Sequence, residues 1–136
     1  MCGIAGIINN FSNIEEAKNK ISRMINIIDH RGPDETCAVI GKKFCTATAR
    51  LAIEKVQEGY QPVFSENKKY ILSFNGEIFN YKEIISKYHF SKKIINSEAK
   101  LLIKLFELKG VDFVKEIQGQ FAISIYDLTN NKLYLF

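Results

Sequence analysis

The order in which apolar patterns follow one another along the chain is the feature that most constrains its fold. Two segments repeat apolar residues at steps of three and four, which is typical of an amphipathic helix with one buried face. The other apolar runs are short, clustered and separated by turn residues, which is typical of strands. Because clustered strands joined by short turns pair antiparallel, this order predicts an α+β fold with antiparallel sheets.

The first helical segment is expected to begin near Ser12 and to end before Gly32-Pro33. Ser12 and Glu15 have the spacing of a capping box, in which two side chains satisfy backbone amides at the start of a helix. Pro33 cannot extend a helix and restricts the residue before it. The apolar stripe of this segment consists of Ile14, Ala17, Ile21, Met24, Ile25 and Ile28.

The second helical segment is expected to begin after Ser97, a plausible N-cap, and to stop at Gly110. Strands are expected at residues 3–8, 37–40, 44–50, 70–74, 122–126 and 133–136, with turns at 41–43 and 129–131. The strand at residues 3–8 is expected to be buried. The chain stops inside an apolar strand, so we expect it to be part of a longer protein.

Composition indicates one globular domain and argues against several other classes of protein. The chain has 136 residues, of which 46% are hydrophobic and 25% charged, with a net charge of +4. The lysines occur in scattered pairs without a basic run between aromatic residues, so we expect no nucleic-acid partner. Neither a membrane-length apolar stretch nor a signal peptide is present, so we expect no membrane partner and a cytoplasmic location.

The cysteines are Cys2, Cys37 and Cys45, an odd number that a reducing compartment would keep as thiols. Their spacing fits no zinc pattern, so we expect no metal ion in this domain. Cys37 and Cys45 fall in predicted strands, where a free cysteine usually packs as a small buried hydrophobe.

Cys2 directly follows Met1, and it carries both a thiol and a free α-amine once Met1 is removed. An α-amine has an ordinary pKa of about 7.7–8.0 and can accept a proton near neutral pH. A nucleophile that is activated by the amino terminus of its own chain is a known catalytic device. The position alone is also consistent with chance or with a buried strand residue, so these alternatives stay open.

A thiol that cleaves an amide needs partners, and the sequence offers a candidate for each. Asn75-Gly76 supplies a side-chain amide and an unobstructed backbone N–H for an oxyanion, although Asn-Gly is also a common hairpin turn. Arg50 has the planar fork that binds a carboxylate in two places, although most arginines simply lie on the surface. Glu98 could receive a substrate ammonium group, although its position in the first turn of a helix also favours the helix dipole.

These residues belong to longer runs that occur in a recognisable order. The runs are Met-Cys-Gly-Ile-Ala-Gly at 1–6, His-Arg-Gly-Pro-Asp-Glu at 30–35, Arg-Leu-Ala-Ile at 50–53, Gln-Pro-Val at 61–63, Asn-Gly-Glu-Ile-Phe-Asn-Tyr at 75–81 and Gly-Gln-Phe-Ala at 119–122. With them the chain resembles the class II glutamine amidotransferase domain of the asparagine synthetases, which belongs to the N-terminal-nucleophile (Ntn) hydrolases. The runs at 30–34 and 75–80 are the most specific, and they favour this branch over the glucosamine-phosphate synthase and phosphoribosyl amidotransferase branches.

The resemblance implies a fold and a set of roles. The fold is an Ntn-hydrolase-like, four-layer αββα sandwich of two antiparallel sheets, truncated at its C-terminus. Cys2 would be the nucleophile with its own α-amine as the base, and Asn75 and Gly76 would form the oxyanion hole. The implied glutamine-binding residues are Arg50, Leu51, Ile53, Asn75, Gly76, Glu77 and Glu98, and Arg31 would support the pocket.

The chain departs from the family pattern near two of these positions. Glu98 stands where the family usually has an aspartate, and Lys100 stands where it usually has a glutamate. Thr48 lies in the short segment before Arg50 in which family members often carry a histidine or a glutamate. These departures leave open a second hypothesis, a non-catalytic module that only packs against a synthetase using free ammonia.

The resemblance also implies partners outside residues 1–136. A synthetase domain that uses ATP and Mg²⁺ would follow this domain, whereas the domain itself needs no cofactor. The ammonia from glutamine would then amidate aspartate to asparagine. A third hypothesis keeps this branch but assigns a different acceptor, such as the carboxylate of a surface sugar. A second copy of the chain, forming a homodimer, is a further partner that the resemblance allows.

Overall fold

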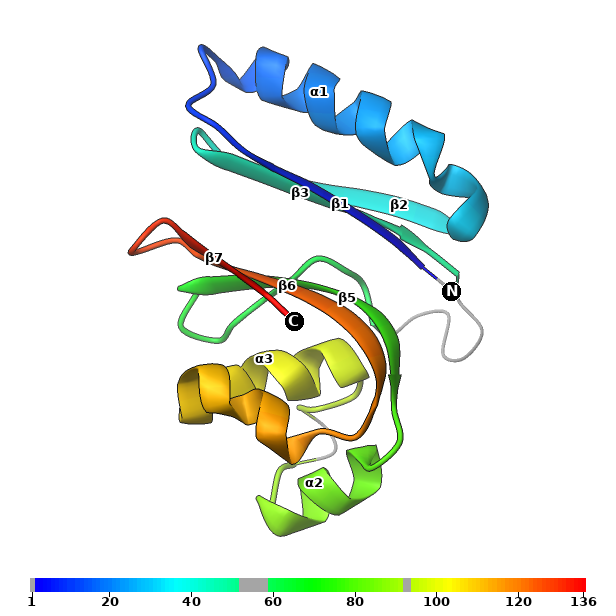
Figure 1. Ribbon diagram of the computed structural model, residues 1–136, viewed down its shortest axis with the longest axis vertical. Coiled ribbons are helices and arrows are strands. Elements are labelled where there is room, and N and C mark those ends of the chain that lie inside the picture. The colour runs from blue at the N-terminus through cyan, green and yellow to red at the C-terminus, as the bar shows by residue number, and fades with distance from the viewer. Residues whose placement is uncertain (1, 52–58, 92–93) are drawn as a thin grey trace.

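A computed structural model describes residues 2–51, 59–91 and 94–136. Two antiparallel sheets lie face to face, with α1 (Ile14–Ile27) on one outer surface and α2 (Tyr81–Lys87) and α3 (Glu98–Lys109) on the other (Figure 1). This αββα arrangement confirms the predicted α+β fold, an Ntn-hydrolase-like sandwich of two antiparallel sheets. None of the helices in the described ranges is long and apolar enough to cross a membrane.

The first sheet is three-stranded, in the order β1-β3-β2, and consists of β1 (Gly3–Ile8), β2 (Glu35–Ile40) and β3 (Phe44–Arg50). Every residue of the central strand β3 is buried, because the strand has neighbours on both sides and is covered on both faces. Its odd-numbered side chains pack against α1, in a cluster that joins Cys45, Ala47 and Ala49 to Ile21 and Ile25.

The second sheet has the order β4-β5-β6-β7 and consists of β4 (Val63–Phe64), β5 (Tyr70–Ile78), β6 (Gly119–Asp127) and β7 (Lys132–Leu135). A large hydrophobic cluster fills the space between its outer face and α3, which contributes Leu101 and Leu105. The predicted caps of this helix are confirmed, since Ser97 caps its start and Gly110 ends it with a φ of 57°. The 3₁₀ segment η2 (Gly110–Glu116) then places Phe113 in the same core.

The inner faces of the two sheets meet along β3 and β5. Phe44 stacks on Tyr126, with 4.2 Å between ring centroids. Oγ1 of Thr46 donates a hydrogen bond to the carbonyl oxygen of Ala5 at 3.2 Å, and it lies 2.9 Å from Oγ of Ser73. Because Thr46 donates its hydroxyl proton to Ala5, Ser73 is the donor in the second bond. These buried contacts fix how one sheet sits on the other.

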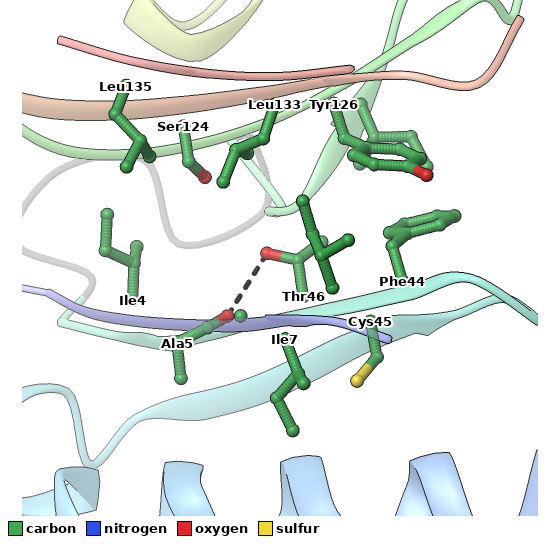
Figure 2. Close-up of a pocket in the computed structure, with 13 residues that line it drawn as sticks. Ile4, Ala5, Ile7, Phe44, Cys45, Thr46, Ser124, Tyr126, Leu133 and Leu135 are labelled. Atoms are coloured by element: carbon green, nitrogen blue, oxygen red, sulfur yellow. Dashed lines mark hydrogen bonds between the residues drawn. The ribbon is translucent and has the colours of Figure 1, made fainter. Parts of the chain in front are cut away.

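An apolar cavity of about 240 Å³ opens between the sheets beside these contacts (Figure 2). Hydrocarbon side chains form most of its wall, including Ile4 and Ile8 of β1 and Leu133 and Leu135 of β7. None of the described residues that the sequence predicts to bind glutamine lines this cavity. The predicted glutamine site therefore lies elsewhere.

The start of α1 differs from the prediction by one residue. Its N-cap is Asn13, whose side chain accepts a hydrogen bond from the backbone N–H of Glu16 at 2.8 Å. The Glu16 carboxylate in turn accepts from the N–H of Ser12 at 2.8 Å. The predicted pairing of Ser12 with Glu15 is therefore wrong, because Asn13 caps a helix as well as serine does. Hydrogen bonds from Lys20 and Ser12 lower the pKa of Glu16 to about 2.

The strands lie close to their predicted positions, with two differences. β5 continues to Ile78 through Asn75-Gly76, so the alternative reading of this dipeptide as a hairpin turn is wrong. β1 has the predicted bounds, but it is an edge strand in which only Gly3 is buried, so its prediction as a buried strand is wrong. The sequence did not predict α2, β4 or η2, which are too short for hydrophobic periodicity to reveal.

We expect Gly32→Ala to destabilise the folded protein by about 2–4 kcal/mol, because it overpacks a buried contact. Gly32 follows the 3₁₀ turn η1 (Asp29–Arg31), and a Cβ added to it would lie 2.2 Å from the carbonyl oxygen of Ala49 on β3. Urea unfolding of the full-length protein measures the loss. The control is Gly6→Ala, whose added Cβ would have its nearest neighbour at 3.4 Å. Equal losses in the two variants would contradict the explanation.

Candidate active site

Strand alternation brings Cys2 and Arg50 to one end of the space between the sheets. The even-numbered side chains of β3, including Thr46 and Arg50, point toward the second sheet because the odd-numbered ones pack on α1. Gly3 lies opposite Ala49 in the β1–β3 ladder, so one further step places Cys2 opposite Arg50. In Figure 1 the N-terminus lies at the end of the sandwich where β3 finishes.

Cys2 is a half-buried free thiol at the start of β1. Its carbonyl oxygen accepts a hydrogen bond from Nε of Arg31 at 3.3 Å. Arg31 is in η1, immediately after α1, so the helix of the first layer ends beside the backbone of Cys2. This contact holds the peptide that follows the Cys2 Cα and leaves the thiol itself untouched.

Arg50 is buried, with 7% of its surface exposed, at the C-terminal end of β3. Its Nη1 lies 3.3 Å from Oε2 of Glu35, the residue directly opposite it in the β2–β3 ladder. Its guanidinium carbon lies 5.8 Å from the ring centroid of Tyr60, within the range of a cation–π contact. An ion pair and an aromatic ring thus hold a buried positive charge at this end of the sandwich.

Gly59 lies between Arg50 and the start of α3. A Cβ built on Gly59 would be 3.6 Å from Nη2 of Arg50 and 3.5 Å from Cβ of Ser97, the N-cap of α3. Glu98 is the first residue of that helix, and its Oε1 accepts a hydrogen bond from the backbone N–H of Ile78 at 2.6 Å. The Arg50 guanidinium and the N-cap of α3 therefore lie on either side of Gly59, and Glu98 directly follows that N-cap.

Asn75 and Gly76 lie within β5, opposite Ala122 and Phe121 of β6. Gly76 has a φ of +149°, and a Cβ on it would lie 2.1 Å from the carbonyl oxygen of Gln120. Only glycine fits this backbone, which approaches β6 too closely for any side chain. The side-chain oxygen of Asn75 is buried and has no hydrogen-bond partner among the described residues.

The other predicted site residues lie around these groups. Leu51 follows β3 directly and is half-buried, and Glu77 is exposed on β5 opposite Gln120. Ile53 lies outside the described residues. Lys100, the sign-reversed position, is exposed on α3, where its backbone N–H donates to the Ser97 hydroxyl at 3.3 Å.

Sequence reasoning missed two neighbours of Arg50, namely Glu35 and Tyr60. The predicted turn at 41–43 would pair Ile40 with Phe44 and so place Glu35 opposite Ala49, one residue short of the observed pairing of Glu35 with Arg50. No comparable signal pointed to Tyr60, whose place beside Arg50 depends on the path of a loop.

The other two cysteines are poor candidates for the nucleophile. Burial, followed by the charge of Glu35, raises the pKa of the Cys37 thiol. Burial also raises the pKa of Cys45, whose Sγ lies 3.8 Å from the carbonyl oxygen of Ala17. Both thiols therefore stay protonated at neutral pH and react slowly. The prediction of a buried strand residue is confirmed for Cys45 but wrong for Cys37, which is only half-buried.

Comparison with known proteins identifies the family. The family model described as "Glutamine amidotransferase domain" matches residues 1–136. The chain belongs to the glutamine amidotransferase domain family. It is 36% identical, over 99% of its length, to "Asparagine synthetase [glutamine-hydrolyzing] 2" of Bacillus subtilis, of which it covers 18%. It is 30% identical, over 93% of its length, to "Asparagine synthetase B [glutamine-hydrolyzing]" of Escherichia coli, of which it covers 23%.

The match to these relatives is confined to one part of each. An Arabidopsis thaliana protein named "Asparagine synthetase [glutamine-hydrolyzing] 1" is 29% identical over 96% of this chain, which again covers 22% of the relative. This amidotransferase chain therefore spans about a fifth of the length of the curated relatives that it matches.

We expect Glu35→Gln to destabilise the folded protein by about 1–3 kcal/mol, because the buried Arg50 charge loses a charged partner. Urea unfolding of the full-length protein measures the change. The matched control is Glu66→Gln, which removes the partner of Lys104 from an ion pair whose Glu66 side chain is 60% exposed. We expect the control to change stability by less than about 1 kcal/mol. A control loss as large as that of Glu35→Gln would contradict the role of burial.

Proposed function

We propose that this domain hydrolyses glutamine to glutamate and ammonia through a γ-glutamyl thioester on Cys2. The observation that carries the proposal is that Gly59 lies between the Arg50 guanidinium and the start of α3, where Glu98 supplies a carboxylate. These groups match the α-carboxylate and the α-ammonium of a free amino acid. Membership of the glutamine amidotransferase family supports glutamine as that amino acid.

The reaction that we propose needs Cys2 at the amino terminus, with Met1 removed. The α-amine of Cys2 takes the thiol proton, and the sulfur attacks the side-chain carbonyl carbon of glutamine. The Asn75 amide and the Gly76 N–H then donate to the resulting oxyanion. The carbon–nitrogen bond breaks as the α-ammonium returns its proton to the leaving nitrogen, which departs as ammonia. Water then cleaves the thioester, which releases glutamate and restores the thiol.

Substrate binding in this proposal divides between two layers of the sandwich. Arg50, held by Glu35 on the first sheet, would bind the α-carboxylate, and the backbone near Leu51, Ile53 and Glu77 would line the pocket. Glu98 at the start of α3 would attract the α-ammonium. Its carboxylate already accepts a hydrogen bond from the backbone N–H of Ile78, which ties α3 to the strand that carries the oxyanion donors.

For the whole protein, we propose that the ammonia amidates an aspartate carboxylate activated with ATP and Mg²⁺ in an attached synthetase domain. The printed names of the relatives and the fraction of them that this chain covers support this assignment. Another carboxylate acceptor would use the same glutaminase, so the acceptor is found by testing candidates with the full-length protein. The three free cysteines support the cytoplasm as the place of action.

We expect Cys2→Ala to reduce the glutaminase activity of the full-length protein by about a thousandfold or more, as loss of a nucleophile does. Glutamate release from glutamine is the measurement. Ammonia-dependent synthesis should persist, because it does not use the thiol, and it shows that the variant is folded. Glutaminase activity that survives the substitution would refute the thioester mechanism.

The non-catalytic alternative makes an opposite prediction, which covalent labelling tests. We expect a glutamine analogue that carries a diazoketone to label Cys2 alone, because the pKa values of Cys37 and Cys45 are raised. Intact mass should show one added label on a chain that lacks Met1. A chain that keeps Met1 or takes no label at Cys2 would favour the packing module.

We expect Glu98→Gln to raise the KM for glutamine by about tenfold while kcat changes little, since one charged contact to the ammonium is lost. The glutamine side chain keeps an oxygen that can accept from Ile78, so the fold is retained. Steady-state glutaminase kinetics measure both constants. Glu83→Gln, on the exposed side of α2, is the control and should leave the KM unchanged. An unchanged KM in Glu98→Gln would exclude Glu98 from substrate binding.

A further inference from the structure

Two buried side-chain oxygens lack a hydrogen-bond partner among the described residues and lie on strands that face one another. One is Oγ1 of Thr48 on β3, a residue with 0% of its surface exposed. The other is Oδ1 of Asn75 on β5. Buried polar atoms in native proteins are nearly always hydrogen-bonded, so a pair of exceptions in one place requires an explanation.

Their positions on the two strands place both residues one step beyond a hydrogen bond that joins the sheets. Oγ1 of Thr46 and Oγ of Ser73 form a hydrogen bond across the space between the sheets. Figure 1 shows β3 and β5 running in the same direction, toward the end of the sandwich that holds the N-terminus. Two residues further along each strand, on the same inner faces, come Thr48 and Asn75. Strand alternation therefore directs both side chains into the space between the sheets.

Neighbours within the first sheet do not account for the Thr48 hydroxyl. Ile4 lies opposite Thr48 on β1 and has no polar side-chain atom. Cys37 lies opposite it on β2, and its thiol interacts with the Glu35 carboxylate. The second sheet is therefore the direction in which a partner for Thr48 remains.

We propose that Thr48 is a positioning residue, whose hydroxyl holds one bridging water that donates a hydrogen bond to Oδ1 of Asn75. This bond holds the amide so that Nδ2 faces the reacting carbonyl. The inference rests on the proposed function, in which Asn75 supplies an oxyanion donor. Thr48 itself touches neither the substrate nor the Cys2 thiol in this arrangement.

The two ends of an asparagine amide have nearly the same shape, so neighbouring groups decide which end points where. If Oδ1 turned toward the substrate, a partial negative charge would face the developing oxyanion. A water held by the hydroxyl can donate or accept, but once Nδ2 is committed to the oxyanion, this water must donate to Oδ1. Thr48 thus stabilises the one amide orientation that helps the reaction.

Glutaminase kinetics of the full-length protein test the effect on catalysis. Thr48→Val keeps the shape and removes the hydroxyl, so we expect kcat to fall about tenfold with KM unchanged within twofold. Thr48→Ser keeps the hydroxyl and should restore most of kcat. Thr46→Val is the matched control, because it breaks the neighbouring bond to Ser73 and should lower stability without lowering kcat. An unchanged kcat in Thr48→Val, or equal losses in the valine and serine variants, would overturn the proposal.

A second measurement does not depend on glutaminase activity. Urea unfolding of Thr48→Val, Asn75→Ala and the double variant forms a double-mutant cycle. We expect the change in the unfolding equilibrium constant of the double variant to differ about fivefold from the product of the two single changes. Strictly additive effects would overturn the proposed link between the two side chains. A wild-type protein without glutaminase activity would refute the proposed function, whereas the coupling would still decide whether Thr48 holds Asn75.

Discussion

The burial of β3 on both faces is the constraint on which the rest of the structure depends. One face of this strand packs Cys45, Ala47 and Ala49 against α1. The other carries Thr46, which binds Ser73 of the second sheet, and ends in Arg50. A slip of one residue in the register would turn Arg50 toward α1 and send the small apolar residues into the space between the sheets. The register of β3 thus fixes two features together: how the first two layers pack and which way the predicted carboxylate-binding group points.

A buried arginine needs compensation, and the sheet supplies it through the neighbouring strand. Glu35 lies opposite Arg50 and pairs with it at 3.3 Å, so the guanidinium has a fixed place before any substrate arrives. A buried charge that is already paired is much less costly than a free one. The β2–β3 hairpin therefore both forms part of the first sheet and positions the guanidinium of the proposed glutamine site.

Glu98 shows how the structure accommodates a departure from the family pattern. Compared with aspartate, its side chain is one methylene longer, and in this fold the carboxylate reaches the backbone N–H of Ile78 at 2.6 Å. Ile78 ends the strand that carries Asn75 and Gly76. The longer side chain thus links the start of α3 to the strand with the proposed oxyanion donors, and a negative charge stays at the helix terminus, where it is favourable.

Much of the fold could be predicted from the sequence, and the misses have physical causes. The end of α3 at Gly110 followed from backbone chemistry, and the turn at 41–43 followed from the residues around it. The start of α1 was missed by one residue because Ser12 and Asn13 are both good caps. The strand through Asn75-Gly76 was ambiguous, because an Asn-Gly pair suits a turn equally well until β6 is in place to pair with it.

The sequence by itself determined the alternation of apolar faces, the helix stops and the candidate nucleophile at position 2, since these depend on local pattern and residue chemistry. Only the tertiary structure decided that Arg50 is buried against Glu35, that Gly59 separates it from the start of α3, and that Thr48 and Asn75 lie on strands that face each other. Those relations join segments from separate strands and loops. They depend on how two sheets pack on each other, which local propensity does not encode.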